Sequence, residues 1–275
     1  MKKNKITLIT EMALFVSIGF ILDFIQGTIS NFLPFFPNGG SIGIAMIATL
    51  IFSYRHGLYG LLCGLLTGFL TMLSGVWISP FANNPLHVFL QLGLDYFFSY
   101  FVIGLAGCFA YLISKKQGKT KLILLIVTSI SSGLLKYLSH FLAGMIYWPN
   151  EDATSQFIYS LTYNGSYMIP SIILTTLLLV LIYFKAPSIL EYKETHEEVS
   201  LINNSKLSLS VLVVSIIGFI SSLYFYIESF IIYDDLIASY GEVFSASEVM
   251  LFFLIIFILL IIISLTSYLK NRKTK

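Results

Sequence analysis

The sequence is dominated by long apolar runs, each close to the roughly 20 residues that a helix needs to cross a bilayer. Eight such runs are predicted to be transmembrane helices, near residues 7–26, 40–54, 57–75, 87–113, 121–146, 158–184, 207–232 and 247–269. Only 11% of the 275 residues are charged, whereas a water-soluble domain has about 25%. We therefore expect an all-α integral membrane protein. Its net charge of +2 gives no reason to expect a nucleic-acid partner.

A charged stretch, EYKETHEEVSLINNSK, follows the sixth predicted helix and divides the chain. We expect a six-helix membrane unit over residues 1–190, a cytosolic linker over 191–206 and a two-helix extension over 207–275. The first apolar run contains Glu11 and Asp23 and lacks a small-residue cleavage site. It is therefore predicted to be a retained first helix and not a signal peptide.

Lysine and arginine residues are sorted onto one side of this eight-helix arrangement. The stretches concerned are MKKNK, Arg55, KKQGKTK, Lys185, Lys193, Lys206 and KNRKTK. The opposite loops, 27–39, 76–86, 147–157 and 233–246, contain neither residue type. Since basic loops stay in the cytosol, we expect a multi-pass protein of the cell membrane with both termini cytosolic.

Of the 16 basic residues, only Lys136 falls inside a predicted span. A charge at the centre of the bilayer costs about 3 kcal/mol on insertion scales, so Lys136 needs a partner or a wet cavity. It lies roughly 22 Å from the cytosolic end of its helix at 1.5 Å per residue. Lys136, His140, Gly144 and Trp148 follow at intervals of four and therefore share one helix face. Gly144 allows another group to approach the backbone closely.

The preceding predicted helix carries a matching face, on which His87, Gln91 and Asp95 are spaced four apart, with Tyr96 beside them. Asp95 is the natural partner for a cation at this depth. The stretch YSLTYNGSYMIP opens the next helix and adds rings and an amide, from Tyr159, Tyr163, Asn164 and Tyr167. An apolar wall with a few placed polar groups is typical of a small-molecule pocket, here open to the outside.

Each feature also has a purely structural interpretation. Lys136 and Asp95 could form a structural ion pair, and His140 could pack between helices. The tyrosines and Trp148 could belong to an interfacial aromatic belt. Their combination at one depth on three consecutive helices favours a binding site.

Residues 7–190 resemble the thiamine-binding S component of energy-coupling-factor vitamin transporters. Six ordered motifs carry the resemblance, namely EMALFVSIGFILD, NGGSIGIAMI with FSYRHG, GLLTGFL, LDYFFSYFVIGLAG, KYLSHFLAGMIYW and YSLTYNGSYMIPS. The resemblance implies a six-helix bundle that binds thiamine for uptake and is not an enzyme. It implies no cofactor, and the sequence contains no metal-ligand spacing.

The resemblance also implies which residues contact thiamine. The matching positions are Asp95, Tyr96, Lys136, His140, Gly144, Trp148, Tyr159 and Asn164. Some members have Glu in place of Asp95, so the carboxylate here is one methylene shorter. Some have a Trp in the loop after the first helix, where this chain offers Phe35 or Phe36.

The chemistry of thiamine agrees with these residue types. Its cationic thiazolium would be met by the charge of Asp95 and by the ring faces of Tyr96 and Trp148. Its aminopyrimidine needs paired donors and acceptors, which Asn164, Tyr159 and His140 can supply. Lys136 would sit awkwardly beside a cation, so we expect it to orient Asp95 or neighbouring polar groups.

The sequence offers no energy source of its own. The string QGKT at 117–120 ends like a phosphate-binding loop, but Ile113 stands where that loop requires Gly. The resemblance implies that a membrane scaffold subunit and two ATPase subunits supply the energy. Docking on the scaffold would use the small residues Ala13 and Ser17, which are four apart on the first helix.

Three alternatives remain at this stage. One is an S component for another small heterocyclic vitamin. A second is a stand-alone ion-coupled carrier, which would predict inverted repeats that the sequence does not show. A third is a membrane enzyme with His140 and Asp95 as acid and base, for which no nucleophile or metal set is found.

Overall fold

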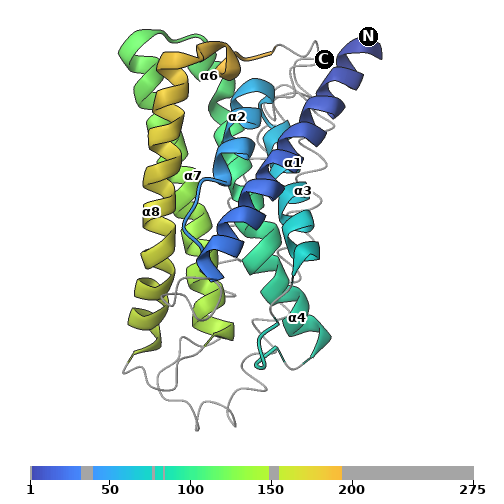
Figure 1. The fold of residues 1–275 in the computed structure, drawn as a ribbon, viewed down its shortest axis with the longest axis vertical. Helices are drawn as coiled ribbons and strands as arrows, with labels where there is room; N and C mark the ends of the chain where they lie inside the picture. Colours follow the sequence, from blue (N-terminus) through green and yellow to red (C-terminus); the bar gives the residue numbers. More distant parts are fainter. Residues whose placement is uncertain (1, 32–39, 76–77, 83, 149–154, 194–275) are drawn as a thin grey trace, which may run out of the picture. The chain divides into compact units, whose positions relative to one another are not determined.

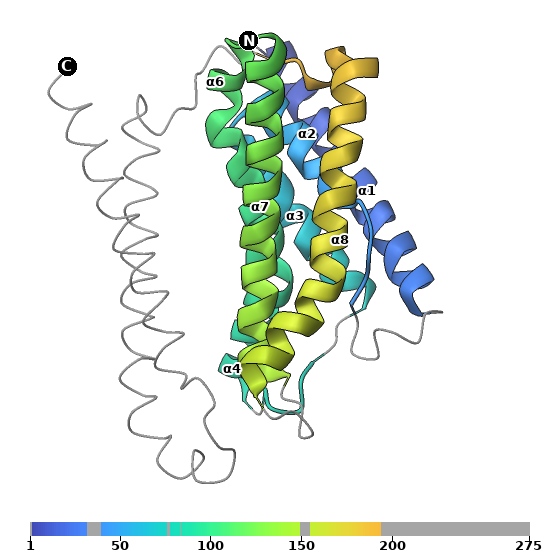
Figure 2. The same cartoon turned by 90° about the vertical axis from the view of Figure 1, so that its left-hand side faces the viewer.

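A computed structural model describes residues 2–31, 40–75, 78–82, 84–148 and 155–193 (Figures 1 and 2). Of these, the described residues up to 148 and those from 158 to 193 belong to a first compact unit. The fold described below is that of the first unit. Both helices predicted in the C-terminal extension, and the linker beyond Lys193, lie outside the described residues.

Helices are the regular secondary structure of the described residues, with no strand among them, which confirms the all-α fold class. The longer helices are α1 (Lys2–Asn31), α2 (Met46–His56), α3 (Tyr59–Ser74), α7 (Gly118–Tyr147) and α8 (Gln156–Lys185). A composite segment lies between α3 and α7. It consists of α4 (Pro85–Leu92), η1 (Gly93–Phe98), α5 (Ser99–Phe101), η2 (Val102–Phe109) and α6 (Ala110–Ser114), and a short η3 (Pro187–Leu190) follows α8.

Four helical segments are long and apolar enough to cross a membrane: Ile6–Ser30, Pro85–Ser114, Gly118–Tyr147 and Gln156–Lys185. The 16-residue α3 is apolar but shorter. Large apolar side chains remain exposed along these segments, for example Ile173, Leu177 and Leu181 on α8. Exposed apolar surface of this extent suits contact with lipid and does not suit contact with water. The chain is a multi-pass membrane protein.

The helix predicted near 40–54 begins later than expected, at Met46. Side chains of other helices bind the backbone N–H groups ahead of it. Gly43 N donates to Ser171 Oγ at 3.0 Å, and Ala45 N donates to Gln26 Oε1 at 3.2 Å. Because these donors are satisfied by tertiary contacts, residues 40–45 stay outside the helix.

The helix predicted near 87–113 is continuous but irregular, since η1 is a π-helix and η2 is a 3-10 helix. Serine hydroxyls stabilise the π-helical turn by binding its carbonyl groups. Ser99 Oγ donates to Asp95 O at 2.7 Å, and Ser139 Oγ of α7 donates to Leu94 O at 2.6 Å. Inside a membrane such displaced carbonyls must find a partner within the protein.

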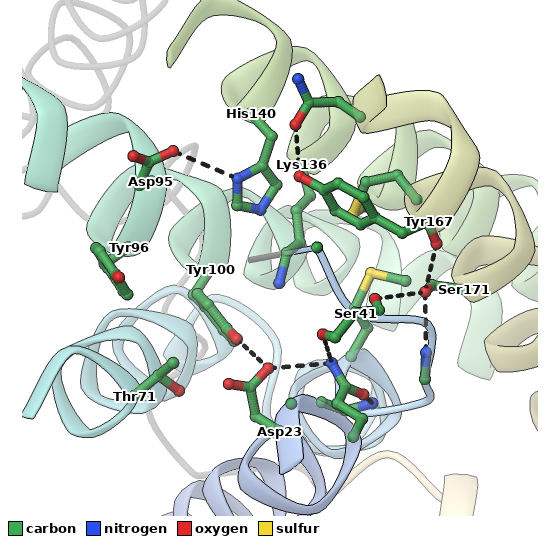
Figure 3. A pocket seen from close by; sticks show the side chains of 18 of the residues that line it. Asp23, Ser41, Thr71, Asp95, Tyr96, Tyr100, Lys136, His140, Tyr167 and Ser171 are labelled. Carbon is green, nitrogen blue, oxygen red and sulfur yellow. Dashed lines mark hydrogen bonds and ion pairs between the residues drawn. The ribbon is translucent and has the colours of Figure 1, made fainter. Parts of the chain in front are cut away.

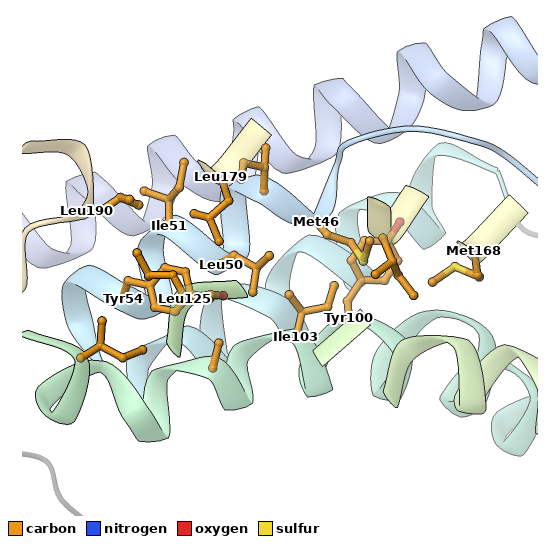
Figure 4. Packing of buried hydrophobic residues seen from close by; sticks show 14 of the residues in the cluster. Met46, Leu50, Ile51, Tyr54, Tyr100, Ile103, Leu125, Met168, Leu179 and Leu190 are labelled. Atoms are coloured by element: carbon orange, nitrogen blue, oxygen red, sulfur yellow. The ribbon is translucent and has the colours of Figure 1, made fainter. Parts of the chain in front are cut away.

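The core is built around α2, where every residue except Arg55 is buried. Its side chains pack against η2, α7 and α8, and the central cluster includes Leu50, Tyr54, Ile103, Leu125 and Leu179 (Figure 4). Tyr54 donates its hydroxyl hydrogen to Leu125 O at 3.2 Å. The buried hydroxyl of Tyr54 is therefore paired, as burial requires.

Glycines bring α3 into close backbone contact with the composite segment. A Cβ on Gly64 would lie 2.3 Å from the carbonyl oxygen of Tyr100, and one on Gly68 would lie 2.4 Å from that of Tyr96. A Cβ on Gly104 would meet the backbone of Gly60 at 2.4 Å. Small residues at such contacts let membrane helices pack through dispersion forces.

A cluster around Glu11 joins α1, α2 and the segment 187–193 that follows α8. Glu11 Oε2 lies 3.2 Å from Arg55 Nη2 and 2.8 Å from His56 Nε2, and Glu11 Oε1 contacts Lys193 Nζ. Arg55 Nη1 also donates to Ile189 O at 3.0 Å. This end of the unit, with the start of α1 and with α6, is uppermost in Figure 1.

The close contact of α3 predicts a sharp difference between two glycines. Gly64→Ala should lower the free energy of unfolding by about 1–3 kcal/mol or more, because the new methyl group meets a backbone carbonyl that has no rotamer to change. Gly93→Ala is the control, since no atom lies within 4 Å of its Cβ. Thermal unfolding in detergent measures both. Equal melting temperatures for the two variants would contradict the contact.

Candidate functional site

A cavity of about 330 Å³ lies among α1, residues 40–46, α3, the composite segment, α7 and α8. Its lining includes all eight residues that the resemblance singled out: Asp95, Tyr96, Lys136, His140, Gly144, Trp148, Tyr159 and Asn164. Figure 3 shows several of them converging on one space. The volume is in the range of small-molecule sites.

Asp95 projects from the π-helical turn η1, and its carboxylate has three neighbours. Gln91 Nε2 and Trp148 Nε1 each donate to Oδ2 at 3.3 Å, and His140 Nδ1 lies 3.6 Å from Oδ1 (Figure 3). Asp95 thus pairs with His140, and the expected pairing with Lys136 is wrong for this structure. The ammonium of Lys136 lies instead over the ring of Tyr100, with Nζ 3.6 Å from the ring centroid.

Gln91 supports Asp95 from a fully buried position. While its Nε2 binds the carboxylate, its Oε1 accepts from Ser79 N at 3.0 Å. Ser79 in turn donates its hydroxyl to Tyr147 O at the end of α7. One amide therefore fixes the carboxylate relative to the segment 78–82 and, through Ser79, to α7.

Lys136 is 6% exposed and its ammonium lies over the ring of Tyr100, with Nζ 3.6 Å from the ring centroid. A cation over an aromatic face gains about 0.5–2 kcal/mol, more where water is excluded. This contact explains part of how a lysine is tolerated at this depth.

The α8 wall of the cavity is fixed by hydrogen bonds. Asn164 Nδ2 donates to Ser160 O at 2.9 Å, and Asn164 Oδ1 accepts from Tyr167 OH at 2.5 Å. A Cβ on Gly144 would lie 2.3 Å from Ser160 Oγ. The group that approaches Gly144 is therefore α8. The amide of Asn164 is held in one orientation, with a second lone pair on its oxygen.

Rings line the same wall in a row. The rings of Tyr159 and Tyr163 stack at 5.6 Å, and the rings of Tyr163 and Tyr167 meet edge-on at 6.1 Å. His140 extends the row, with its ring 6.1 Å from that of Tyr167. The three tyrosines are spaced four apart on α8, so their spacing in the sequence already predicts that they share one helix face.

Sequence reasoning missed several lining residues, namely Asp23, Gln26, Ser41, Tyr100 and Ser171. Asp23 accepts hydrogen bonds from Tyr100 OH and, at 3.2 Å, from Gln26 Nε2. The signal for Asp23 was present, since an acidic residue inside an apolar span indicates a functional site. The same acidic residue that argues against a signal peptide therefore also indicates a polar site on the first helix.

The remaining predicted positions lie elsewhere. Ala13 and Ser17 are exposed on α1 and do not line the cavity. Phe35 and Phe36 fall outside the described residues. Within the described ranges, no group of three His, Cys, Asp or Glu residues is arranged to hold a metal ion.

A comparison with family models matches residues 9–191 to the family described as thiamine transporter protein. Among curated proteins, the chain is similar to the thiamine transporter ThiT of Bacillus subtilis (strain 168). The two are 34% identical over 197 residues, which cover 69% of this chain and 97% of the relative.

Among solved structures, the fold is similar to that of ThiT from Listeria monocytogenes, with a TM-score of 0.55. The match covers 69% of this chain and 100% of that protein at 21% sequence identity. At this identity the likeness bears on the fold alone.

The position of Gln91 predicts that its loss destabilises the ligand-free protein. Gln91→Leu keeps the approximate volume but removes the acceptor of Ser79 N and one of the two donors to Asp95 Oδ2, which should cost about 1–3 kcal/mol of unfolding free energy. Phe89→Leu, on the same helix at a side chain that is 67% exposed, should cost little. Denaturation in detergent compares the two, and an unchanged stability of Gln91→Leu would contradict the bridge.

Proposed function

Because the chain belongs to the thiamine transporter family, we propose that it binds thiamine in this cavity as the substrate-binding subunit of an energy-coupling-factor uptake system. The observation that carries the proposal is Asp95, a carboxylate framed by aromatic rings within a cavity of small-molecule size. Family membership also places the chain among transporters and not among enzymes.

The thiazolium ring is the part of thiamine that best fits Asp95. A permanent cation in a membrane cavity needs an opposite charge and polarisable surfaces to replace its water shell. Asp95 supplies the charge, and Tyr96 and Trp148 line the cavity with their rings. The indole N–H of Trp148 already donates to Asp95, which holds the ring next to the charge.

The aminopyrimidine fits the α8 side of the cavity. His140 and Asn164 provide ring nitrogen and amide groups there, and Tyr159 and Tyr163 provide a stacked pair of rings. Because hydrogen bonds to Ser160 and Tyr167 already orient Asn164, little ordering is needed when a ligand binds.

The topology supports a cavity that opens outside the cell. Trp148 follows the end of α7 and Tyr159 lies near the start of α8. Arg55 lies in the last turn of α2 on the opposite side, next to Glu11 with Lys193, and Lys185 is the last residue of α8. If the basic end faces the cytosol, as the distribution of Lys and Arg indicates, both termini of the chain are cytosolic and the ligand enters from outside.

Docking on a scaffold subunit is proposed for α1. Ala13 and Ser17 are exposed on this helix, and Ser17 Oγ donates to Ala13 O at 2.8 Å. The hydroxyl is therefore satisfied within the helix, so this face can meet an apolar partner without an unpaired polar group. The partners would be a membrane scaffold and two ATPase subunits, since no nucleotide motif was found in the sequence.

Titration of the purified protein with thiamine tests the binding proposal. Thiamine should quench the fluorescence of Trp148. Asp95→Asn should lower the affinity for thiamine about tenfold to a hundredfold, which is the range for the loss of a hydrogen bond or contact with a charged group. The affinity for a neutral thiophene isostere of thiamine should fall much less in the same variant. Calorimetry measures both affinities.

Three outcomes would contradict this assignment. Equal losses for the cation and its neutral isostere would make Asp95 structural. Full quenching in Trp148→Phe would show that Trp148 does not report the ligand. Tight binding of another heterocyclic vitamin in place of thiamine would favour a different substrate.

Uptake in cells separates binding from transport. Ala13→Trp should leave thiamine affinity in detergent near normal, because Ala13 lies outside the cavity, yet it should abolish uptake in cells that make the scaffold and ATPase subunits. Ile173→Trp, at an exposed position on α8, is the matched control and should transport normally.

Normal uptake by Ala13→Trp would remove α1 as the docking surface. Robust uptake by the lone chain, driven by a proton or sodium gradient, would replace the subunit proposal with a self-sufficient carrier.

A further inference from the structure

We infer that Asp23 is the counter-ion of Lys136 and a positioning residue for Tyr100, so that the cavity presents the charge of Asp95 to a cationic ligand. The inference rests on the proposed function for its ligand, but the pairing itself concerns the ligand-free protein.

The described part of the cavity lining carries few charges. Asp23 and Asp95 are carboxylates, Lys136 is an ammonium and His140 is titratable. With His140 neutral, two negative charges and one positive charge leave a net charge of −1. A monovalent organic cation would bring that total to zero, which is the favourable state in a membrane interior.

Tyr100 connects Asp23 to Lys136. Its hydroxyl donates to Asp23 Oδ1, and its ring face supports the ammonium of Lys136, with Nζ 3.6 Å from the centroid. Tyr100 is buried, with 4% of its surface exposed. A phenol that donates to a carboxylate becomes more electron-rich at its ring, which strengthens its attraction for a cation.

Asp23 is itself held in place by a second donor. Gln26 Nε2 donates to Asp23 Oδ1 at 3.2 Å and to Ser41 Oγ at 3.2 Å, while Gln26 Oε1 accepts from Ala45 N. The carboxylate is thus fixed to α1 and to residues 41–45. A group fixed in this way can hold a charge balance without moving when a ligand enters.

The two carboxylates lie on different sides of Lys136. Figure 3 shows Asp95 beside His140 and Asp23 beside Tyr100, with Lys136 and its ammonium on the Tyr100 side. Gln91 and Trp148 donate to Asp95 and add no charge of their own, and neutral His140 lies beside it, with Nδ1 3.6 Å from Oδ1. Asp95 is therefore the carboxylate whose charge is available to a ligand, because the charge of Asp23 is offset by Lys136.

A charge-swap series tests this division of roles. Asp23→Asn keeps an oxygen that accepts from Tyr100 but removes the charge, so the net charge of the cavity rises from −1 to 0. Its Kd for thiamine should rise at least about tenfold, whereas that of the neutral thiophene isostere should change less than about threefold. Asp23→Asn combined with Lys136→Met restores a net charge of −1 and should bind thiamine at least about threefold more tightly than Asp23→Asn alone.

Thermal unfolding without ligand tests the pairing independently of thiamine. Asp23→Asn and Lys136→Met should each lower the melting temperature, and the double variant should lower it by clearly less than the sum. Additive effects would overturn the pairing. Equal weakening of cation and isostere by Asp23→Asn, or a double variant that does not recover, would overturn the proposed role in ligand selectivity.

The two proposals fail in different ways. A wild-type protein that binds no thiamine, together with a non-additive unfolding cycle, would reject the proposed function and support the Asp23–Lys136 pair. Thiamine binding together with an additive unfolding cycle would support the function and reject the pair.

Discussion

Close backbone contact between α3 and the composite segment positions the backbone from which several cavity side chains project. Gly64 and Gly68 allow the carbonyl groups of Tyr100 and Tyr96 to lie against α3, so the two tyrosines and the intervening turn are held without side chains between the helices. Asp95 directly precedes Tyr96 in η1. The binding chemistry therefore depends on an apolar packing contact that carries no chemistry of its own.

The sequence predicted the helices and one face of the cavity because both follow from regular spacing. Intervals of four aligned Lys136, His140 and Gly144 on α7, and similar intervals aligned the α8 tyrosines. Four of the six apolar runs within residues 7–184 correspond to helices long enough to cross a membrane, whereas the helices of the runs 40–54 and 57–75 are shorter, at 11 and 16 residues. What spacing could not predict is the π-helical turn, because serine hydroxyls from two helices stabilise it through tertiary contacts.

The partner of Lys136 was also beyond helical spacing. Asp95 was the nearest acid by predicted depth, yet its neighbours are His140, Gln91 and Trp148. The ammonium of Lys136 lies over the ring of Tyr100, and the hydroxyl of Tyr100 donates to Asp23 on α1, which is 77 positions away in sequence. The prediction of a helix over residues 40–45 is wrong for a similar reason. The side chains that accept hydrogen bonds from this segment come from α1 and α8, which helical spacing cannot reveal.

Helix α1 contributes to two surfaces that face different surroundings. Asp23 points into the cavity, whereas Ala13 and Ser17 are exposed ten and six positions earlier, about 15 Å and 9 Å along the axis. A helix transmits tilt and translation along its whole length because its backbone hydrogen bonds resist bending. A protein that binds the exposed face of α1 thus also contacts the helix that forms one wall of the cavity. A movement of α1 away from the composite segment would separate Asp23 from Tyr100.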